Sequence, residues 1–306
     1  MIISLTGGLG NQLFQYFAGL SFLSDAENLL ITSNFGAPRN TGDITDLEFF
    51  LLYENTQILN VSKVGRFTRK VANLALTKNL LVEGKPSRLS KSEFLDSCLP
   101  FYFSLLLRKK VSVFSSDAIG YTSKIPNSNS LLFGYFQSYK YFLSLPRHKR
   151  VLTLKSESSE FKSLKKRIMQ EKPLVLHVRL GDYLKEKHFG VLTNDYYSKG
   201  IELHDREEGQ TKIWLFSDDP VHALEILPTE AKERIFVVPN NILNPAESLE
   251  LMRYGSRYLI ANSSFSWWGA MLSYSTSTNV VAPAKWFNGM EDPYELIPKN
   301  WKLLSR

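Results

Sequence analysis

Residues 177–183 could bind an anion and move a proton. The apolar run before them is typical of a buried strand, on which His177 and Arg179 point to the same face. An arginine at the end of a strand can bind two phosphate oxygens, and His177 can donate to the same anion or to a leaving group. Gly181 permits a sharp turn that presents Asp182 beside this site. An ion pair between Arg179 and Asp182 that only fixes a loop is the competing interpretation.

A second cluster, Ser217-Asp218-Asp219, offers two adjacent carboxylates after another apolar run. Carboxylates accept hydrogen bonds from the N–H edge of a guanine or from ribose hydroxyls. Asp219 also precedes Pro220, which is the pattern of a helix N-cap followed by a proline at the first helical position. The cluster therefore predicts a nucleoside contact for Asp218 or Asp219, without a choice between them.

A third cluster combines small polar residues with the expected start of a helix. Free backbone N–H groups and hydroxyls at a helix N-terminus form an anion site that a pyrophosphate fits. Capping of the helix by Ser263 or Ser264 is compatible with this role. The residues of this cluster are Asn262, Ser263, Ser264, Phe265 and Ser266.

A glycine-rich segment at residues 7–12 follows the first apolar run. It lacks the third glycine of the NAD-binding fingerprint, because Leu13 occupies that place, and no acidic residue ends the next strand. Its glycines still allow a ligand to approach the backbone closely, and two amide side chains lie beside them. The residues expected to contact a ligand here are Gly8, Gly10, Asn11 and Gln12.

The elements that position these clusters alternate between strands and helices. In the first half we expect strands at 2–6, 29–32 and 131–137, a helix after the glycines, and mostly helix at 46–121. In the second half we expect strands at 174–179, 212–216, 235–238, 258–261 and 279–282. The helices between them are expected at 161–170, at 196–204 with Asn194-Asp195 as cap, from Asp219, from Asn244 to Tyr254, and around Trp267.

Alternating strands and helices indicate a parallel sheet with helices on both faces. In such sheets ligands bind outside the carboxyl ends of the strands. The three clusters of the second half each follow a strand, so all three are expected on the same rim. Their coincidence predicts a binding site there.

Length and composition are those of an ordinary globular protein of 306 residues, with 43% hydrophobic and 22% charged residues. The length suits two domains, which we place at residues 1–160 and 161–306. The single cysteine, Cys98, excludes an internal disulfide framework and a cysteine-rich zinc site. Together with the absence of a signal peptide pattern at the first residues, it predicts a cytoplasmic protein.

The net charge of +7 is concentrated in one stretch. Residues 61–110 carry eleven Lys and Arg against three Asp and Glu, or +8, and the remainder of the chain sums to −1. Such a stretch suits an anionic membrane surface, at about 1 kcal/mol per Lys or Arg near the surface. A solvated basic face is the alternative, and since no nucleic-acid-binding motif is present we expect no nucleic acid as partner. Peripheral contact with the inner face of a membrane is the expectation.

Several catalytic signatures are absent from the sequence: the Walker A lysine motif, H-E-x-x-H and the serine nucleophile elbow. Asp218 and Asp219 are adjacent and lack the D-x-D spacing that holds a divalent metal on a sugar nucleotide. A donor site made of arginine, backbone N–H groups and a helix N-terminus is the simpler hypothesis. We therefore expect neither a metal nor a cofactor.

Four segments together resemble the signature blocks of bacterial α-1,2-fucosyltransferases, glycosyltransferase family 11. They are G-G-L-G-N-Q-L-F-Q-Y at 7–16, H-V-R-L-G-D-Y at 177–183, F-S-D-D at 216–219 and N-S-S-F-S-W-W-G-A at 262–270. Weaker matches are F-G-Y-F-Q at 133–137 and D-Y-Y at 195–197. The matches follow the family's order along nearly the whole chain, and the combination is specific although each block alone is not.

This resemblance implies an α/β, GT-B-like fold with two Rossmann-like domains facing across a cleft. It implies an inverting, metal-independent transfer of fucose from GDP-fucose to a hydroxyl of a galactose-containing glycan, lipid-linked glycans included, in surface polysaccharide or O-antigen synthesis. By position, His177 and Arg179 would hold the diphosphate, Ser217, Asp218 and Asp219 would lie near the nucleoside, and residues 263–266 near the phosphates. Gly8 to Gln12 would lie near the fucose and the acceptor. Asp182, beside the diphosphate site, is the candidate base.

One departure from the family pattern is Leu180, where a second arginine usually follows the first. On a strand Leu180 faces away from His177 and Arg179, so phosphate binding survives its presence, and an arginine at 180 would tighten GDP binding or leave it unchanged. Two alternatives remain open. One is a transferase using a different nucleotide sugar, and the other is a non-catalytic basic protein that binds membranes or nucleic acid and whose site has decayed.

Overall fold

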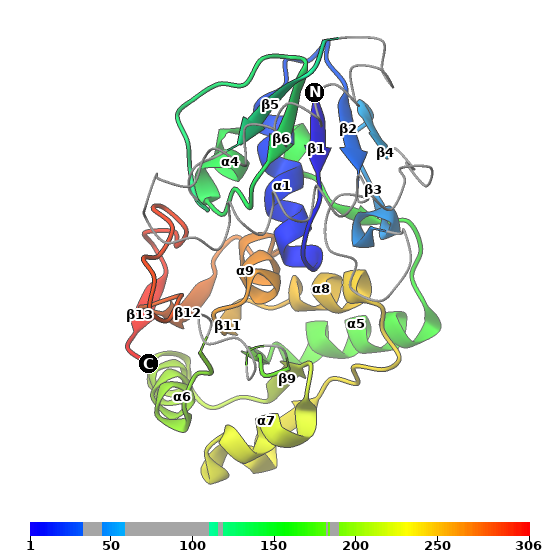
Figure 1. Cartoon of the computed structure of the whole chain (residues 1–306). Coiled ribbons are helices and arrows are strands. Elements are labelled where there is room, and N and C mark those ends of the chain that lie inside the picture. Colours follow the sequence, from blue (N-terminus) through cyan, green and yellow to red (C-terminus); the bar gives the residue numbers. More distant parts are fainter. Residues whose placement is uncertain (33–44, 59–109, 116–118, 182, 184–189) are drawn as a thin grey trace. The chain divides into compact units, whose positions relative to one another are not determined.

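The computed structural model describes residues 1–32, 45–58, 110–115, 119–181, 183 and 190–306. These residues divide into two compact units (Figure 1). The first comprises Met1–Thr153 with Pro293–Ile297, and the second comprises Leu154–Asp292 with Pro298–Arg306. The boundary drawn from the sequence at residue 160 falls inside a helix, α5 (Ser159–Glu171). Cys98 and almost all of the basic stretch at 61–110 lie outside the described residues.

The described part of the first unit contains a five-stranded sheet in the order β4-β2-β1-β6-β5, with parallel pairing throughout. Because the chain passes from β1 through α1 to β2 on one side, and β6 flanks β1 on the other, the direction of winding reverses between β1 and β6. The strands are β1 (Ile2–Ser4), β2 (Leu29–Thr32), β4 (Thr56–Ile58), β5 (Ser112–Ser115) and β6 (Ser130–Phe133).

The helix α1 (Leu9–Ser21) follows β1 directly, as expected, and nearly its whole length is buried. Gly19 lets the helix approach β2, because a Cβ there would lie 2.9 Å from the Leu29 side chain. The expectation of mostly helix at 46–121 is wrong where that segment is described, since its apolar runs are too short for a helix and pair as strands. The other elements here are η1 (Asp46–Phe49), β3 (Phe50–Leu51), α4 (Tyr139–Ser144), η3 (Arg147–Arg150) and β7 (Thr153–Leu154).

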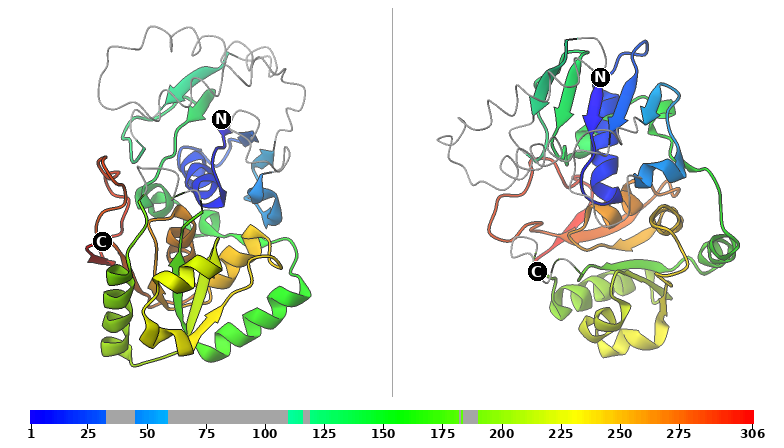
Figure 2. Two further views of the ribbon diagram at one scale, coloured as in Figure 1. Left: turned by 60° about the horizontal axis from the view of Figure 1, so that its bottom comes forward. Right: turned by 45° about the vertical axis from the view of Figure 1, so that its right-hand side comes forward.

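The described part of the second unit contains a six-stranded parallel sheet in the order β10-β9-β8-β11-β12-β13. Figure 2 draws the ribbon of this unit from two further sides. Counted along the chain, this is the order 3-2-1-4-5-6 of a doubly wound Rossmann sheet, in which the winding reverses between β8 and β11. The strands are β8 (Leu174–Val178), β9 (Ile213–Ser217), β10 (Ile235–Val237), β11 (Arg257–Leu259), β12 (Asn279–Pro283) and β13 (Lys302–Leu304). The remaining elements are α6 (Asn194–Glu208), α7 (Pro220–Ile226), η5 (Thr229–Arg234), α8 (Pro245–Met252) and α9 (Ser264–Met271).

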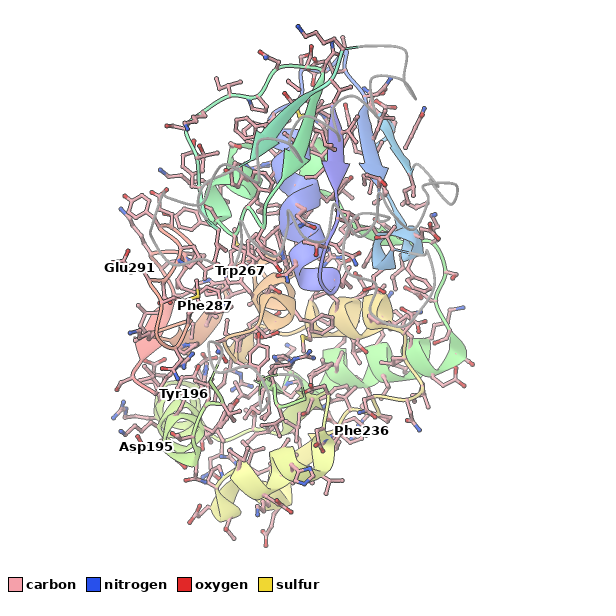
Figure 3. The ribbon with its side chains drawn as sticks, in the orientation of Figure 1. Asp195, Tyr196, Phe236, Trp267, Phe287 and Glu291 are labelled. Carbon is pink, nitrogen blue, oxygen red and sulfur yellow. The ribbon has the colours of Figure 1, made fainter. Side chains whose placement is uncertain are left out.

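The side chains of successive residues in β8 point to opposite faces of this sheet. Leu174, Leu176 and Val178 belong to a core cluster that also contains Tyr196 and other residues of α6 and α7. The odd-numbered residues face the layer made by α5, α8 and α9, where His177 contacts α9. Trp267 from α9 and Tyr196 from α6, both fully buried, are labelled in Figure 3. The sheet therefore carries His177 on the face that α9 covers.

Capping residues fix where two helices of this unit begin. Asp219 caps α7 and precedes its first-turn proline, and Asn244 forms a reciprocal capping box with Glu247 at the start of α8. Both starts were expected from the sequence. The expected cap of α6 is wrong, because Asn194 is already helical and Thr193 occupies the N-cap without a side-chain hydrogen bond. The Asn194 amide instead donates to the carbonyl of Ile226 at 2.8 Å.

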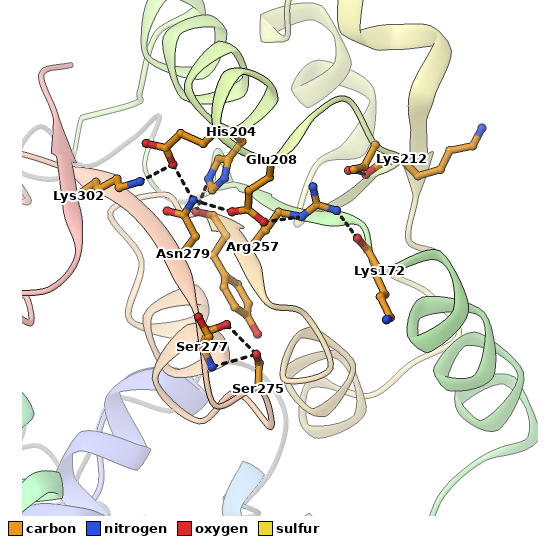
Figure 4. A network of polar contacts seen from close by, with 12 residues as sticks. Lys172, His204, Glu208, Lys212, Arg257, Ser275, Ser277, Asn279 and Lys302 are labelled. Carbon is orange, nitrogen blue, oxygen red and sulfur yellow. Dashed lines mark hydrogen bonds and ion pairs between the residues drawn. The ribbon is translucent and has the colours of Figure 1, made fainter.

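The amino ends of β11, β12 and β13 are tied to neighbouring segments by their first residues (Figure 4). Asn279 donates to Glu207 at 2.8 Å and to Glu208 at 2.7 Å, and Lys302 pairs with Glu207. Arg257 donates to the carbonyl of Lys172 at 2.6 Å. These polar contacts hold the C-terminus of α6 at the amino ends of the strands, opposite their carboxyl ends.

The fold class expected from the sequence, α/β and GT-B-like with two Rossmann-like domains, is confirmed. The strand β13 was not expected, since the last strand predicted from the sequence covers residues 279–282. Lys302 to Leu304 form a short edge strand without an alternating pattern. Among the described residues no helix is long and apolar enough to cross a membrane.

Candidate functional site

The carboxyl ends of β8 and β11 are neighbours, and the polar clusters at residues 177–183 and 262–266 therefore adjoin. They flank the point at which the winding of the second sheet reverses. In open α/β sheets this crevice is where ligands bind. The cluster at 217–219 follows β9, which pairs with β8 on its other side. The common rim expected for the three clusters is thus present.

Arg179 lies one residue beyond β8, and its guanidinium lies 3.3 Å from Asp218, at the end of β9. The second carboxylate oxygen of Asp218 accepts from the backbone N–H of Leu180 at 3.0 Å. The Arg179 side chain also lies against the ring of Tyr183, 5.6 Å from the ring centre. Asp218 thereby holds both the Arg179 guanidinium and the backbone of Leu180 in place. The side chain of Arg179 remains 21% exposed, so an anion can reach it.

Gly181 allows this close approach between the two strand ends. A Cβ at this position would lie 2.2 Å from a carboxylate oxygen of Asp218, a distance that no side chain tolerates. The glycine therefore leaves room for the Asp218 carboxylate, whereas its φ is not positive and the turn itself does not require glycine. Asp182, the candidate base, lies outside the described residues, and its role stays a prediction.

Leu180 lies on the opposite face from Arg179, as expected. Its side chain is 1% exposed and belongs to the same core cluster as Leu176 and Val178. An arginine at this position would have to place its charge among apolar side chains, which is costly unless the charge is paired. The expectation that an arginine at 180 would tighten or preserve GDP binding is therefore replaced by one of lost stability.

His177 is buried, and its Nδ1 lies 2.9 Å from the hydroxyl of Ser266 on α9. The Ser266 hydroxyl also lies 3.3 Å from the carbonyl of Ser263, to which it can donate. Burial, reinforced by the nearby charge of Arg179, lowers the pKa of His177 to about 3. The neutral ring fixes the first turn of α9 through a hydrogen bond rather than through charge.

This buried neutral histidine makes stability depend on pH. In the unfolded chain the imidazole takes up a proton below its ordinary pKa of 6.5, whereas the folded protein does not until about pH 3. The contribution of His177 is therefore complete above pH 6.5 and declines as the pH falls, by up to about 1.4 kcal/mol per pH unit. We expect His177→Asn to flatten the loss of unfolding free energy between pH 6.5 and 4, measured in urea. An unchanged pH slope in this variant would contradict the buried neutral state.

The start of α9 presents backbone N–H groups without a side-chain cap. Ser263 is the N-cap residue, but its hydroxyl makes no capping hydrogen bond. The first N–H groups of a helix have no intrahelical partner, and the helix dipole gives them a partial positive charge. Ser264 and Phe265, which open the helix, are partly exposed, while Ser266 is held by His177. This end of α9 is suited to an anion such as a diphosphate.

The side chain of Asn262 is buried and hydrogen-bonded within the protein. It is 1% exposed, and its amide donates to the carbonyls of Trp286 at 3.0 Å and Gly190 at 3.3 Å. Its own carbonyl accepts from the hydroxyl of Tyr183 at 3.0 Å. Asn262 thus joins the loop after β12 to the loop after β8. Tyr183, which also contacts Arg179, was not among the residues expected from the sequence.

Asp219 turns away from Asp218 toward α7. One carboxylate oxygen accepts from the backbone N–H of His222 at 3.3 Å, and the other lies 2.7 Å from the His222 ring. The hydrogen bond from the His222 side chain lowers the pKa of Asp219. The backbone N–H of Asp219 donates to the hydroxyl of Ser217 at 3.0 Å. The two carboxylates therefore serve different elements, and only Asp218 faces Arg179.

In the first unit the glycine-rich loop follows β1. Gly7 has a left-handed backbone, with φ of +76°, and a Cβ there would lie 2.6 Å from the Asn11 amide. Gly8 is the N-cap of α1, and Gly10 is buried within its first turn. Gln12 donates to the carbonyl of Gly7 at 3.1 Å and accepts from the hydroxyl of Thr45 at 2.7 Å. The loop is closed by its own amide side chains.

Asn11 connects this loop to the segment after β6, on the other side of the winding reversal. Its side-chain oxygen accepts from the Gln137 amide at 3.0 Å. Gln15 adds a second connection. Its side-chain oxygen accepts from the backbone N–H of Thr6 at 3.0 Å, and its side-chain nitrogen donates to the carbonyl of Gly134 at 2.9 Å. Thr45, Gln15 and Gln137 were not predicted as site residues, although the F-G-Y-F-Q match pointed to Gln137. The rim of the first unit is thus a small group of amide side chains.

Comparison with known proteins places this pair of units in a family. A model described as Glycosyl transferase family 11 matches residues 2–302. The chain belongs to glycosyltransferase family 11. The O-antigen biosynthesis glycosyltransferase WbnK of Escherichia coli is 30% identical over 324 residues, covering 94% of this chain and 95% of WbnK. An α-1,2-colitosyltransferase of Escherichia coli is 24% identical over 317 residues, covering 100% of this chain and 99% of that protein. The resemblance read from four motifs is confirmed.

Solved structures of similar fold include three transferases. The fucosyltransferase NodZ from Bradyrhizobium is 10% identical, with a TM-score of 0.47 over 89% of this family 11 chain and 92% of NodZ. POFUT1 in complex with GDP-fucose is 14% identical, with a TM-score of 0.47 over 90% of this chain and 96% of POFUT1. The ADP-heptose LPS heptosyltransferase II of E. coli is 10% identical, with a TM-score of 0.47 over 99% and 89%.

Proposed function

We propose that this family 11 glycosyltransferase moves fucose from GDP-fucose to a hydroxyl of a galactose-containing glycan, with inversion and an α-1,2 linkage. The proposal extends to a role in O-antigen or other surface polysaccharide synthesis, in line with the name of its relative WbnK, an O-antigen biosynthesis glycosyltransferase. One observation carries this proposal. Arg179 and the start of α9 both lie where the winding of a Rossmann sheet reverses. A nucleoside diphosphate is the ligand that such a site suits.

The proposed chemistry is direct displacement at the anomeric carbon. The bond from that carbon to the β-phosphate oxygen breaks while the acceptor oxygen attacks from the opposite face. Negative charge then grows on the departing GDP. Arg179 and the N–H groups of Ser264 to Ser266 would stabilise that charge, which is commonly the largest contribution to catalysis.

The contacts of the other side chains in the site suggest the role of each. Asp218 positions Arg179, and His177 positions Ser266, so both act through another residue. Asp182 is proposed as the base that accepts the acceptor proton. The reaction is proposed to need no metal, because an arginine and a helix N-terminus can supply the positive charge for the diphosphate.

The sugar and acceptor are proposed to meet the first unit at its amide group. Gly8, Gly10, Asn11 and Gln12 lie at the start of α1, and Gln137 extends this group across the winding reversal. Amide side chains donate and accept hydrogen bonds, which suits sugar hydroxyls. Asn11 and Gln137 are partly committed to each other, so a sugar would bind to their remaining groups.

Colitose is a second candidate for the donor sugar, because a relative covering the whole chain is named an α-1,2-colitosyltransferase. Colitose is 3-deoxy-fucose, so the two donors differ in one hydroxyl. A site that hydrogen-bonds this hydroxyl rejects the deoxy sugar strongly, whereas an apolar pocket discriminates weakly. Comparing GDP-fucose with GDP-colitose at equal concentrations separates the two donors.

The nucleotide is tested by thermal denaturation with GDP, UDP, CMP and dTDP. We expect GDP to raise the melting temperature and the other three to have little effect, because binding to the folded state adds about 2.7 kcal/mol at a hundredfold excess over Kd. GDP should stabilise equally in the presence of EDTA. Stabilisation by UDP but not by GDP would replace the fucose proposal with one for another nucleotide sugar.

Activity is then tested by release of GDP from GDP-fucose with lactose as acceptor, followed by linkage analysis of the product. A non-catalytic basic protein would give no turnover with a broad acceptor panel. It would still bind vesicles containing anionic lipid, or DNA, in a salt-sensitive manner. Peripheral membrane contact through the basic stretch at 61–110 remains part of the proposal, and the same vesicles test it. Turnover together with vesicle binding is the expected result.

A further inference from the structure

Two exposed tyrosine rings lie beside one lysine at the surface of the first unit. Tyr294 is 76% exposed and Tyr121 is 38% exposed. The ammonium group of Lys140 lies 4.8 Å from the ring centre of Tyr121 and 5.9 Å from that of Tyr294. Single exposed aromatic residues are common, but two that share one cation form a defined surface. This surface of Tyr121, Lys140 and Tyr294 is called the tyrosine platform below.

The platform is held in place from below by Glu295. Its carboxylate lies 2.7 Å from the Lys140 ammonium group, and only 11% of its side chain is exposed. Its carbonyl accepts from the hydroxyl of Ser138 at 3.0 Å and from the backbone N–H of Tyr139 at 3.1 Å. Glu295 has a left-handed backbone, with φ of +62°, a conformation that costs a non-glycine residue about 1 kcal/mol. These contacts fix the backbone beside the exposed Tyr294 ring.

The 119–122 loop is fixed in the same way. The hydroxyl of the largely buried Tyr141 accepts from the backbone N–H of Thr122 at 2.9 Å. The Tyr141 ring lies 5.1 Å from that of Tyr121. One face of Tyr121 is thus backed by protein, and the more exposed Tyr294 has the freer ring. The platform is therefore preformed, which reduces the entropy lost when a ligand binds.

The platform adjoins the amide group at the rim of the first unit. The backbone N–H of Gln137, whose side chain contacts Asn11, donates to the carbonyl of Ile119 at 2.7 Å. Ile119 lies two residues before Tyr121, and Gln137 lies three residues before Lys140. Phe136 between them has φ of +50° and a buried ring. A ligand that contacts Asn11 and Gln137 would therefore extend toward the platform.

We propose that the tyrosine platform is a subsite for a pyranose ring of the acceptor glycan, an inference that rests on the proposed function. The sugar next to galactose in lactose or N-acetyllactosamine has faces of C–H groups, which carry weak positive charge and pack on the negative face of an aromatic ring. Tyr294 provides that face, and Tyr121 forms a side wall. Lys140, whose side chain is 42% exposed, offers a donor for the hydroxyl groups at the ring edge. The sugar bound here is a neighbour of the one that receives fucose.

The test measures binding of lactose and N-acetyllactosamine to the full chain by saturation-transfer NMR and titration, without nucleotide. We expect Tyr294→Ala to raise the dissociation constant about tenfold. Tyr294→Phe should leave it nearly unchanged, because phenylalanine keeps the ring on which the sugar stacks. Tyr121→Ala should give a smaller loss. Ile125→Ala is the matched control, because Ile125 is 83% exposed near the same loop and contributes no ring. The melting temperature and GDP affinity of all four variants should match the wild type.

The outcomes separate this inference from the proposed function. Equal affinity of the wild type and Tyr294→Ala for both glycosides would overturn the platform, as would no binding of either glycoside to the wild type. If Tyr294→Ala loses binding but the wild type transfers no fucose from GDP-fucose, the platform stands and the donor proposal fails. If fucose transfer proceeds and Tyr294→Ala keeps the wild-type KM for lactose, the donor proposal stands and the platform fails.

Discussion

Replacing Arg179 with alanine is expected to weaken GDP binding at least about a hundredfold. Hydrogen bonds to charged groups contribute about 1.5 to 3 kcal/mol each, and a guanidinium can make two to a diphosphate. A hundredfold change in Kd corresponds to about 2.7 kcal/mol. Because the same arginine would stabilise the charge on departing GDP, kcat/KM should fall by about a hundredfold to a thousandfold. Isothermal titration with GDP and initial rates with GDP-fucose measure the two effects.

Arg206→Ala provides the matched control for this change. Arg206 is exposed on α6, so the substitution removes the same charge from the second unit away from the strand ends. It should leave both quantities unchanged. Asp218→Asn should give an intermediate loss, because it removes the charge that positions Arg179 but not the arginine. Wild-type GDP affinity in Arg179→Ala would contradict the assignment of the site.

Replacing Leu180 with arginine is expected to destabilise the protein by about 3 kcal/mol or more. Leu180 is 1% exposed and packs in a cluster of apolar side chains that includes Leu176, Val178 and Tyr197. An unpaired charge buried among apolar groups is among the most damaging single changes. Urea denaturation followed by circular dichroism measures the loss of unfolding free energy.

Leu180→Met is the matched control, since methionine has nearly the volume of leucine and such exchanges cost less than about 1.5 kcal/mol. The Leu180→Arg protein is expected to bind less GDP only in proportion to its unfolded fraction. Full stability of Leu180→Arg with tighter GDP binding would mean that residue 180 faces the rim. In that case the departure from the family pattern would concern the donor rather than the core.

The fold of the second unit was largely predictable because local signals and tertiary packing agree there. Leu174 to Arg179 reads as a fully buried strand, and β8 occupies all of it except the last residue. Proline at the first helical position, preceded by Asp219 or Asn244, marked two helix starts that the structure confirms. Neighbouring carboxyl ends of strands follow from parallel order, so the common rim could be inferred without knowing the strand order.

Other features depend on contacts that a linear pattern does not carry. The strand β13 is only three residues long and is defined by pairing with β12. Likewise, the predicted strand at 131–137 stops at Phe133, because Gly134 and Phe136 take positive φ values and turn the chain toward α4. The amide network of Asn11 and Gln137 joins residues that are 126 positions apart. Such contacts become visible only when β1 and β6 are paired.

Within the candidate site, residue types were predictable but partners were not. The sequence placed an acid beside Arg179, and the structure identifies Asp218, from another strand, as a partner. The sequence offered His177 to the diphosphate, whereas the structure buries the ring and joins it to Ser266. Residues with similar patterns thus divide into those that can touch a ligand, such as Arg179, and those that position their neighbours.

The central claim is that the diphosphate of a GDP-sugar binds where β8 and α9 meet. A crystal structure of the protein with GDP tests it most directly. We expect phosphate oxygens within hydrogen-bonding distance of the Arg179 guanidinium and of backbone N–H groups at Ser264 to Ser266. A diphosphate bound instead at the glycine loop of the first unit, with Arg179 still paired only to protein groups, would contradict the account.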